Sequence, residues 1–372
     1  MGKGNSLLRS NRSSQLSIDN SAVPRMTTDL ANSQKLTSKR APARATVSLV
    51  IVVWNAKKYV QECLESLREH CRGVYDEVIV VDNASSDGSP DLIEETFPEF
   101  KLIRNSENLG FAKANNIGIG QSSGEYVCLV NSDVKFTSDC LSPMLQYMQA
   151  NPGVGMVGPK MLGRDGRAWR STMRFPTVWN QFSRALGLDA AFKHSRWFGG
   201  YLMSDFDHQT TIPVDVLNGW FVLVRRSGLD KVGPLDPQFF MYGEDVDWCY
   251  RFHLAGEKMV FFADAEAIHY GGASSSNAPI RFYLEQCYAN WQYWRKHRGW
   301  LARMAFLGSL TIYHAVRLLA ASWAYLILPS QRPQSLAKLK RAAVCLQWVS
   351  QPQRTPLEMG LDGGTRSGSQ TA

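Results

Sequence analysis

Runs of apolar residues separated by amphipathic helical patterns constrain the fold of this chain more than any other feature. The runs are Val47–Trp54, Val78–Val81 and Tyr126–Val130, with a shorter stretch at Lys101–Arg104. Continuous apolar runs are typical of strands that are buried on both faces of a sheet. Their alternation with helices predicts an α/β fold with a mixed, mostly parallel sheet and helices on both faces.

Polar residues directly follow three of these strands. They are Asn55, Asp82–Ser86 and Asn131–Asp133. Because ligands of open parallel sheets bind at the carboxyl ends of the strands, these positions predict one shared binding site. Each stretch taken singly also matches an ordinary turn rich in Asp, Asn and Ser, so the pattern alone leaves a structural role open.

Three carboxylates stand within four residues at the start of a helix predicted over 244–255. They are Glu244, Asp245 and Asp247. The positive end of a helix dipole favours acidic side chains, which accounts for one or two of them. A carboxylate pair in a cleft is also what general-base deprotonation of a hydroxyl requires.

A histidine and an aspartate that each follow a predicted strand form a possible metal-binding pair. They are His269 and Asp133. An imidazole nitrogen and a carboxylate oxygen together suit Mn²⁺ or Mg²⁺. A lone histidine is more often structural, so both interpretations stay open.

Several enzyme classes lack their sequence signatures. The glycines Gly118, Gly120 and Gly124 do not form G-x-G-x-x-G and precede a strand, which argues against a nicotinamide-dependent oxidoreductase. No H-E-x-x-H, G-x-S-x-G or P-loop motif occurs. The seven cysteines include no C-x-x-C pair, so the sequence suggests neither a disulfide framework nor a cysteine zinc site, and we expect a reducing, cytosol-facing protein.

The net charge of +8 is distributed unevenly along the chain. Residues 1–46 contain 8 basic and 2 acidic residues, and residues 295–372 contain 11 basic and 2 acidic residues. Residues 47–294, in contrast, contain 22 basic and 29 acidic residues. A nucleic-acid binder is expected to carry its basic excess on a folded face. Basic flanks around an acidic centre instead favour an anionic membrane surface as a partner and argue against nucleic acid.

The composition divides the chain into four predicted parts. We expect a disordered basic leader over 1–46, an α/β domain over 47–294, a basic amphipathic helical region over 295–350 and a flexible tail over 351–372. The leader has no apolar segment of a secretory signal, and either Met1 or Met26 can be the start. Residues 160–214 are irregular and rich in aromatic, Arg and Gly residues, so we expect a long loop region that sets specificity.

Residues 304–328 are strongly apolar but contain His314 and Arg317. At 3.6 residues per turn, both fall on one narrow face with Arg303. This pattern favours an amphipathic helix that lies in the membrane interface. A buried helix in a C-terminal helical layer and a membrane-spanning helix are the alternatives.

Taken together, these stretches resemble the inverting GT-A glycosyltransferases of family 2, over roughly residues 47–290. The nearer likeness is to the rhamnosyltransferase-like branch, which builds bacterial surface polysaccharides. The resemblance implies a Rossmann-like GT-A domain over 47–294. The strings that carry it are Val50–Asn55, Val81–Ser89, Glu107–Asn116, Asn131–Asp133, Asn218–Phe221 and Gly243–Asp247.

The resemblance also implies roles for individual residues. Asp133 and His269 would bind Mn²⁺ or Mg²⁺, although Asn131 stands where the family's D-x-D motif has its first acid. Asp245, or else Glu244, would take the proton from the acceptor hydroxyl. The residues that would contact the nucleotide sugar are Asn55, Asp82, Asn83, Asn108, Gly110, Lys113, Asn115, Asn131 and Ser132, and those that would face the acceptor are Trp220, Asp247 and Trp248.

The implied function is metal-dependent transfer of a sugar, with inversion, from a nucleotide-diphospho-sugar to a hydroxyl of a glycan or polyprenyl-linked glycan. We expect dTDP-rhamnose as the donor, with UDP-galactose, UDP-glucose, UDP-N-acetylglucosamine or GDP-mannose as alternatives. The expected location is cytoplasmic, on the inner face of the cell membrane. A non-catalytic nucleotide-sugar- or carbohydrate-binding protein of the same fold is the competing interpretation, and the sequence does not indicate the oligomeric state.

Overall fold

The computed structural model describes residues 45–271 and 279–361, which belong to one compact unit. The predicted leader lies outside the described residues apart from its last two positions. The predicted tail is described only as far as Leu361. The division of the chain into four parts therefore stays a prediction.

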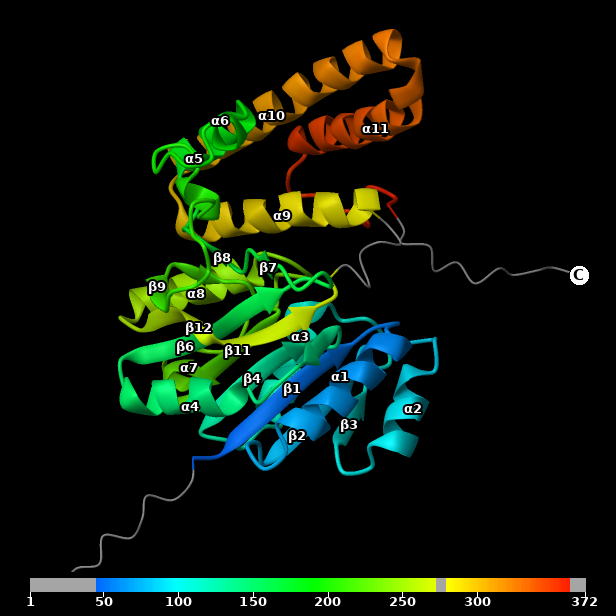
Figure 1. The fold of residues 1–372 in the computed structure, drawn as a ribbon. Coiled ribbons are helices and arrows are strands. Elements are labelled where there is room, and N and C mark those ends of the chain that lie inside the picture. The colour runs from blue at the N-terminus through cyan, green and yellow to red at the C-terminus, as the bar shows by residue number, and fades with distance from the viewer. Residues whose placement is uncertain (1–44, 272–278, 362–372) are drawn as a thin grey trace, which may run out of the picture. The chain divides into compact units, whose positions relative to one another are not determined.

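A mixed sheet forms the centre of this unit (Figure 1). Four parallel neighbours make one half, in the order β3 (Lys101–Arg104), β2 (Glu77–Asp82), β1 (Val47–Val53) and β4 (Tyr126–Asn131). The order continues with β11 (Phe221–Arg225), β6 (Val154–Leu162), β12 (Lys258–His269) and β5 (Val134–Phe136). Of these, β11 is antiparallel to both neighbours, β12 is parallel to β6, and β5 is antiparallel to β12. The short strands are β7 (Ala168–Trp169) beside β6, β9 (Ile212–Val214) beside β12, and the separate pair β8 (Thr172–Met173) and β10 (Val216–Leu217).

Helices cover both faces of the sheet, as the sequence predicts, because alternate residues of each buried strand point to opposite sides. Leu49 and Ile51 of β1 pack with one group of helices, and Val50 packs with the other. The first group is α1 (Lys57–His70), α2 (Ser89–Thr96) and α4 (Leu141–Ala150). The second is α3 (Phe111–Gly120), α7 (Arg226–Val232) and α8 (Glu244–Leu254).

A layer of further helices packs on the second face. Helix α9 (Pro279–His297) contacts α8, and α10 (Trp300–Ile327) packs against α9 and against α11 (Arg332–Val349). A short 3-10 turn, η2 (Pro329–Gln331), joins the last two helices. Helix α9 runs without a break through residue 294, where we predicted the boundary of the α/β domain.

The prediction of a loop region over 160–214 is wrong in part. This stretch contains β7, β8, β9 and two helices, α5 (Val178–Ala185) and α6 (Leu188–Ala191), followed by the 3-10 turn η1 (Gly200–Leu202). A capping box at Thr177 starts α5, since its hydroxyl accepts from the N–H of Asn180 while the Asn180 amide oxygen accepts from the N–H of Thr177. Helix α5 packs against α10, which gives these short elements the tertiary support that their sequence pattern does not reveal.

Close packing of α3 on β1 depends on one glycine. A Cβ atom at Gly118 would lie 2.2 Å from a methyl carbon of Val50, whereas a Cβ atom at Gly120 would meet nothing within 4 Å. We expect Gly118→Ala to lower the free energy of unfolding by about 1–3 kcal/mol through overpacking. Gly120→Ala is the matched control and should leave it unchanged or raise it by up to about 1 kcal/mol. Urea denaturation of both variants tests this, and equal stabilities would contradict the direct contact between helix and strand.

Candidate active site

The pairing of β12 with β5 brings the end of β4 next to His269. In this pairing His269 lies opposite Val134, so the turn Ser132–Asp133 that links β4 to β5 lies beside the imidazole. Nε2 of His269 is 3.0 Å from Oδ1 of Asp133 and 3.4 Å from Nδ2 of Asn131. Three predicted site residues from two distant strands therefore meet at one point.

Trp220 fixes the plane of the His269 ring. The two rings are stacked, with centroids 5.4 Å apart and an interplanar angle of 28°. The main chain of Trp220 is held as well, because its carbonyl accepts from the N–H of Asn131 at 2.8 Å. The indole is buried and lines a cavity, but the face that contacts His269 is not open to a sugar.

Two cavities meet at this point. The smaller has a volume of about 210 Å³ and the larger about 420 Å³. Both are lined by His269 and Asn131, so a molecule in one cavity can touch a molecule in the other across these side chains. The other residues that line both are Phe111, Met241 and Tyr242.

Besides His269, the smaller cavity contains six of the residues predicted to contact donor or metal. They are Asn83, Asn108, Gly110, Asn131, Ser132 and Asp133. The Asn83 amide is already engaged: its Nδ2 donates to the Asn108 side chain and the Gly110 carbonyl, and its oxygen accepts from Asn105 and from the N–H of Leu109. Asn83 thus shapes the loop that carries Asn108 and Gly110, and its contact with the nucleotide sugar stays a prediction.

Four predicted donor contacts do not line either cavity. Asn55 accepts from Ser86 and holds the loop after β2, while the Asn115 amide donates to the Phe111 carbonyl within α3. Lys113 is exposed on α3. Asp82 is buried and accepts from the N–H of Ser85, and its Oδ1 has no hydrogen-bond partner in the described part of the chain. Asn55, Asp82 and Asn115 therefore support the structure around the cavities, whereas Lys113 faces solvent.

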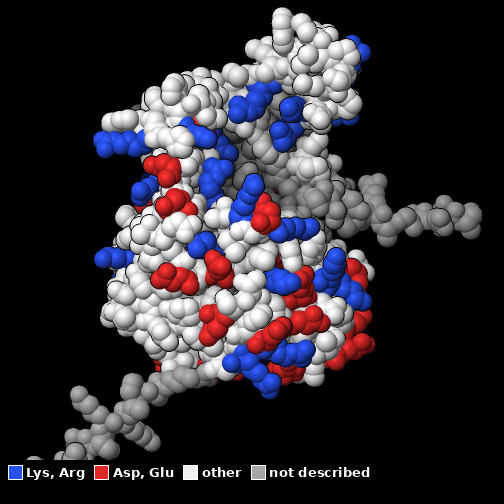
Figure 2. Space-filling model, in the orientation of Figure 1, with Lys and Arg blue, Asp and Glu red and all other residues white. Residues whose placement is uncertain are grey.

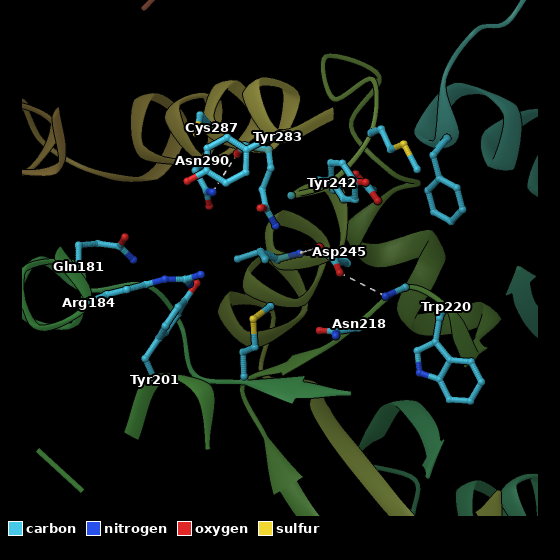
Figure 3. A pocket seen from close by; sticks show the side chains of 18 of the residues that line it. Gln181, Arg184, Tyr201, Asn218, Trp220, Tyr242, Asp245, Tyr283, Cys287 and Asn290 are labelled. Carbon is cyan, nitrogen blue, oxygen red and sulfur yellow. Dashed lines mark hydrogen bonds between the residues drawn. The ribbon is translucent and has the colours of Figure 1, made fainter. Parts of the chain in front are cut away.

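The larger cavity contains Asp245, which begins α8 together with Glu244 (Figure 3). Asp245 accepts from the N–H of Gly219 at 3.2 Å and from the N–H of Val246 at 2.8 Å. Burial raises the pKa of the Asp245 carboxyl above its usual value, and these two donors oppose the shift. The carboxylate is thus held in a fixed orientation on the cavity wall.

Glu244 is more enclosed than its neighbour. Its side chain also lines the cavity, but the residue is only 5% exposed and its Oε2 has no partner among the described residues. Burial, and then the charge of Asp245, raise the pKa of Glu244 well above its usual value. The pair therefore favours one proton on Glu244 and the negative charge on Asp245.

Two residues predicted to face the acceptor lie elsewhere. Asp247 is fully buried and binds Arg251, Lys296 and His297 at 2.7–2.9 Å, which ties α8 to α9. The indole N–H of Trp248 donates to the Gly233 carbonyl at 2.9 Å, and its ring packs in the core. Neither lines the larger cavity, to which α8 contributes Glu244, Asp245 and Val246.

The far wall of the larger cavity comes from elements that the sequence did not define. Gln181 and Arg184 of α5 and Tyr201 of η1 lie across from Asp245, and Tyr283 and Asn290 of α9 form another side (Figure 3). The smaller cavity likewise includes residues that we did not predict. These are Trp54, Phe240, Arg281 and Phe282, of which only Trp54 lies within a motif that the sequence analysis singled out.

Comparisons with known proteins decide the family. The model of glycosyl transferase family 2 matches residues 48–233, half of the chain. The chain belongs to glycosyl transferase family 2. It is similar to the N-acetylglucosaminyl-diphospho-decaprenol L-rhamnosyltransferase of Mycobacterium tuberculosis, with 28% identity over 63% of this chain and 81% of the relative. It is also similar to the low-salt glycan biosynthesis hexosyltransferase Agl10 of Haloferax volcanii, with 26% identity over 55% of this chain and 61% of the relative.

A solved structure confirms the GT-A fold of this family 2 enzyme. The mannosyltransferase PcManGT from Pyrobaculum calidifontis, in complex with GDP-Man and Mn²⁺, superimposes with a TM-score of 0.51 at 18% identity. The match covers 82% of this chain and 88% of that chain. The family match makes the chain a glycosyltransferase. Its structure combines the GT-A fold with a C-terminal helical region, as the sequence predicts.

Replacing Asp245 by Asn keeps the size of the side chain and an acceptor for the Gly219 N–H, but removes the proton acceptor. We expect Asp245→Asn to lower kcat of sugar transfer by about 10²–10⁴-fold while nucleotide binding is unchanged. Asp230→Asn, at an exposed carboxylate of α7, is the matched control and should retain wild-type kcat. Equal activity of the two variants would exclude Asp245 as the base.

The same carboxylate predicts a pH dependence. A base must be ionised, so kcat/KM should fall as pH drops through the pKa of Asp245. Because burial raises that pKa, the acidic limb should lie above the usual value of about 3.9 for Asp, and the residual activity of Asp245→Asn should lack it. An acidic limb that persists in the variant would assign it to another group.

Proposed function

We propose that this glycosyltransferase moves a rhamnosyl group from dTDP-rhamnose to a hydroxyl of a polyprenyl-diphosphate-linked glycan, with inversion at the anomeric carbon. The name of the mycobacterial relative, which specifies L-rhamnose and a lipid-linked N-acetylglucosaminyl acceptor, supports this choice. The observation that carries the reaction is the joined pair of cavities with Asp245 on the wall of the larger one. Under this proposal the smaller cavity binds the donor and the larger one the acceptor.

The smaller cavity suits a nucleoside diphosphate. Trp54 and Phe240 provide aromatic surface for a base or ribose, and the amides of Asn108 and Asn131 provide polar contacts. Arg281 supplies a cation, with its guanidinium 5.8 Å from the centre of the Phe240 ring. A guanidinium binds phosphate oxygens in pairs, so we assign Arg281 to the diphosphate.

The residues beside the smaller cavity fit a divalent cation. Adjacent ligands of an octahedral Mg²⁺ or Mn²⁺ lie about 3 Å apart when each bond is about 2.1 Å. The 3.0 Å separation of Asp133 Oδ1 and His269 Nε2 matches this spacing. Oδ1 of Asn131 is buried with no partner within the described ranges, so it is a third candidate ligand. A cation held by these residues would neutralise charge on the departing diphosphate.

Asp245, assisted by Glu244, then accepts the proton of the acceptor hydroxyl. The acceptor oxygen forms a bond to the anomeric carbon as the bond from that carbon to the diphosphate oxygen breaks, and Asp245 receives the hydroxyl proton. The N–H groups of Gly219 and Val246 hold the carboxylate in place. A neutral Glu244 leaves the negative charge on Asp245. One displacement with one base inverts the anomeric centre and needs no covalent enzyme intermediate.

The apolar surface of helix α10 supports the proposal that the acceptor is bound to a membrane. Of the described residues, it is the one helix long and apolar enough to cross a membrane, and only 22% of its most apolar window is buried. Leu301, Leu319 and Trp323 are about 70% exposed, whereas His314 is buried against the protein. Residues 300–349 include no Asp or Glu. Figure 2 shows fewer charged side chains on the part of the molecule that contains α10 and α11, at the top of the view, than on the part around the sheet.

The neighbouring segment 178–197, which contains α5 and α6, extends this apolar surface. It exposes large apolar side chains beside α10, including two tryptophans that are more than half exposed. An exposed apolar strip flanked by Lys and Arg, in which Asp189 is the one acidic residue of 178–197 and 300–349, fits the interface of an anionic bilayer. We therefore place the enzyme peripherally on the inner face of the cell membrane, where a lipid-linked acceptor is in reach. The exposed side chains of this segment are Trp179, Leu186, Phe192 and Trp197.

The donor and metal assignments predict a pattern of thermal shifts. With Mn²⁺ present, dTDP should raise Tm more than UDP or GDP, because a ligand that binds only the native state stabilises it by linkage. Asp133→Ala should lose this shift, and Asp165→Ala, at an exposed carboxylate, should keep it. A larger shift with UDP or GDP would be consistent with a glycosyltransferase but would exclude dTDP-rhamnose as its donor. No shift with any nucleotide would favour a non-catalytic carbohydrate-binding protein.

The membrane assignment is tested by vesicle flotation. Leu319→Glu should reduce binding to anionic phospholipid vesicles by at least about tenfold, because an inserted leucine contributes about 1.5–3 kcal/mol. Leu254→Glu is the matched control, since Leu254 is 66% exposed on α8 and lies outside the apolar surface. Binding that survives in Leu319→Glu, or that is lost equally in both variants, would contradict the placement of α10 on the membrane.

A further inference from the structure

Each of the three C-terminal helices contributes one metal-binding side chain to a common buried point. The residues are Cys287 of α9, His314 of α10 and Cys345 of α11, and their sulfur and nitrogen atoms all lie within 4.8 Å of one another. They are 6%, 2% and 1% exposed. Their wide spacing along the chain explains why no cysteine motif in the sequence indicates them.

The His314 side chain is hydrogen-bonded to Cys345, but one of its ring nitrogens lacks the partner that burial demands. Nε2 of His314 is enclosed and has no hydrogen-bond partner among residues 45–271 and 279–361. The ring is held edge-on by Tyr283, at 5.8 Å between centroids, and by Tyr313, at 5.0 Å. A buried imidazole nitrogen without a partner is costly, so an additional bonding partner in this space would be stabilising.

We propose that Cys287, His314 and Cys345 bind one Zn²⁺ ion. Two sulfurs and one imidazole nitrogen are a ligand set that zinc prefers. With bonds of about 2.3 Å to sulfur and 2.0 Å to nitrogen, neighbouring ligand atoms of a tetrahedral zinc lie about 3.5–3.8 Å apart. The ligand atoms lie within 4.8 Å of one another, so side-chain movements of about 1 Å would bring them into this range. Two thiolates would balance the charge of the ion.

The position of the site suggests what it does. Cys287 and Tyr283 also line the larger cavity, so the fourth position of the ion can take a water molecule from that side. Zinc would tie α10 and α11 to α9, the helix that presents Tyr283 and Asn290 to the cavity. Its role is therefore to fix the wall of the acceptor cavity, separate from the Mn²⁺ or Mg²⁺ position at Asp133. The zinc site does not depend on which sugar or acceptor the enzyme uses.

Metal content of the full-length protein tests the proposal without an activity assay. Protein purified without chelators, incubated with Zn²⁺ and desalted should contain about one zinc per chain by mass spectrometry of the element. Replacement by Co²⁺ should give the visible bands of tetrahedral cobalt and the ultraviolet band of thiolate-to-cobalt charge transfer. Cys345→Ser should lose both signals.

Cys140→Ser is the matched control. Cys140 is equally buried but lies at the N-cap of α4, where serine is well tolerated, so this variant should keep the zinc and the cobalt bands. A chelator should lower Tm of the wild type and of Cys140→Ser. If Cys345→Ser does not fold, the cobalt spectrum of the wild type decides alone.

Three results would overturn the proposal. The first is wild-type protein that retains no zinc after incubation and desalting. The second is stoichiometric zinc in folded Cys345→Ser. The third is a disulfide between Cys287 and Cys345 in protein trapped under non-reducing conditions, since oxidised sulfurs cannot bind the ion.

Discussion

The antiparallel pairing of β12 with β5 is the constraint on which the active site depends. β4 ends in Asn131 on the parallel side of the sheet, and the chain turns back at once through Asp133 into β5. Because β5 pairs with the end of β12, His269 is placed against that turn. Loss of this pairing would separate the predicted metal ligands and open the border between the two cavities.

A second arrangement orients the acid pair. Helix α8 starts where the chain leaves Gly243, whose backbone has a φ of +75° and whose missing Cβ lets it approach Ala289 of α9. The first turn therefore directs Asp245 into the larger cavity, where the Gly219 N–H holds it. The next carboxylate, Asp247, points to the opposite side and joins α8 to α9 through buried ion pairs, so one acidic motif serves both chemistry and assembly.

The sequence predicted what local patterns encode. Buried strands, their polar ends and the acidic helix start are short-range features, and they located Asp133, His269, Glu244 and Asp245 at the two cavities. It did not separate residues that surround the site from those that face it: the amides of Asn55 and Asn115 form hydrogen bonds within a loop and a helix, and line neither cavity. Side chains such as Arg184, Arg281 and Cys345 reach their places only through tertiary packing, which no local pattern records.

The C-terminal helices connect the proposed site of sugar transfer to the proposed membrane-binding surface. Helix α9 forms a wall of the acceptor cavity, α10 exposes an apolar surface, and α11 closes the layer behind them. An acceptor with a sugar at one end and a lipid at the other can thus be held between the acid pair and a bilayer. This arrangement gives the exposed leucines and tryptophans of α10 a role that packing within the chain does not supply.

A crystal structure with Mn²⁺ and dTDP, with an anomalous map recorded at the manganese edge, tests the central claim most directly. The account predicts one manganese peak bonded to Asp133 and His269, the nucleotide in the smaller cavity near Trp54 and Arg281, and the larger cavity left open beside Asp245. A manganese peak bonded to other residues, or a nucleotide seated in the larger cavity, would contradict it.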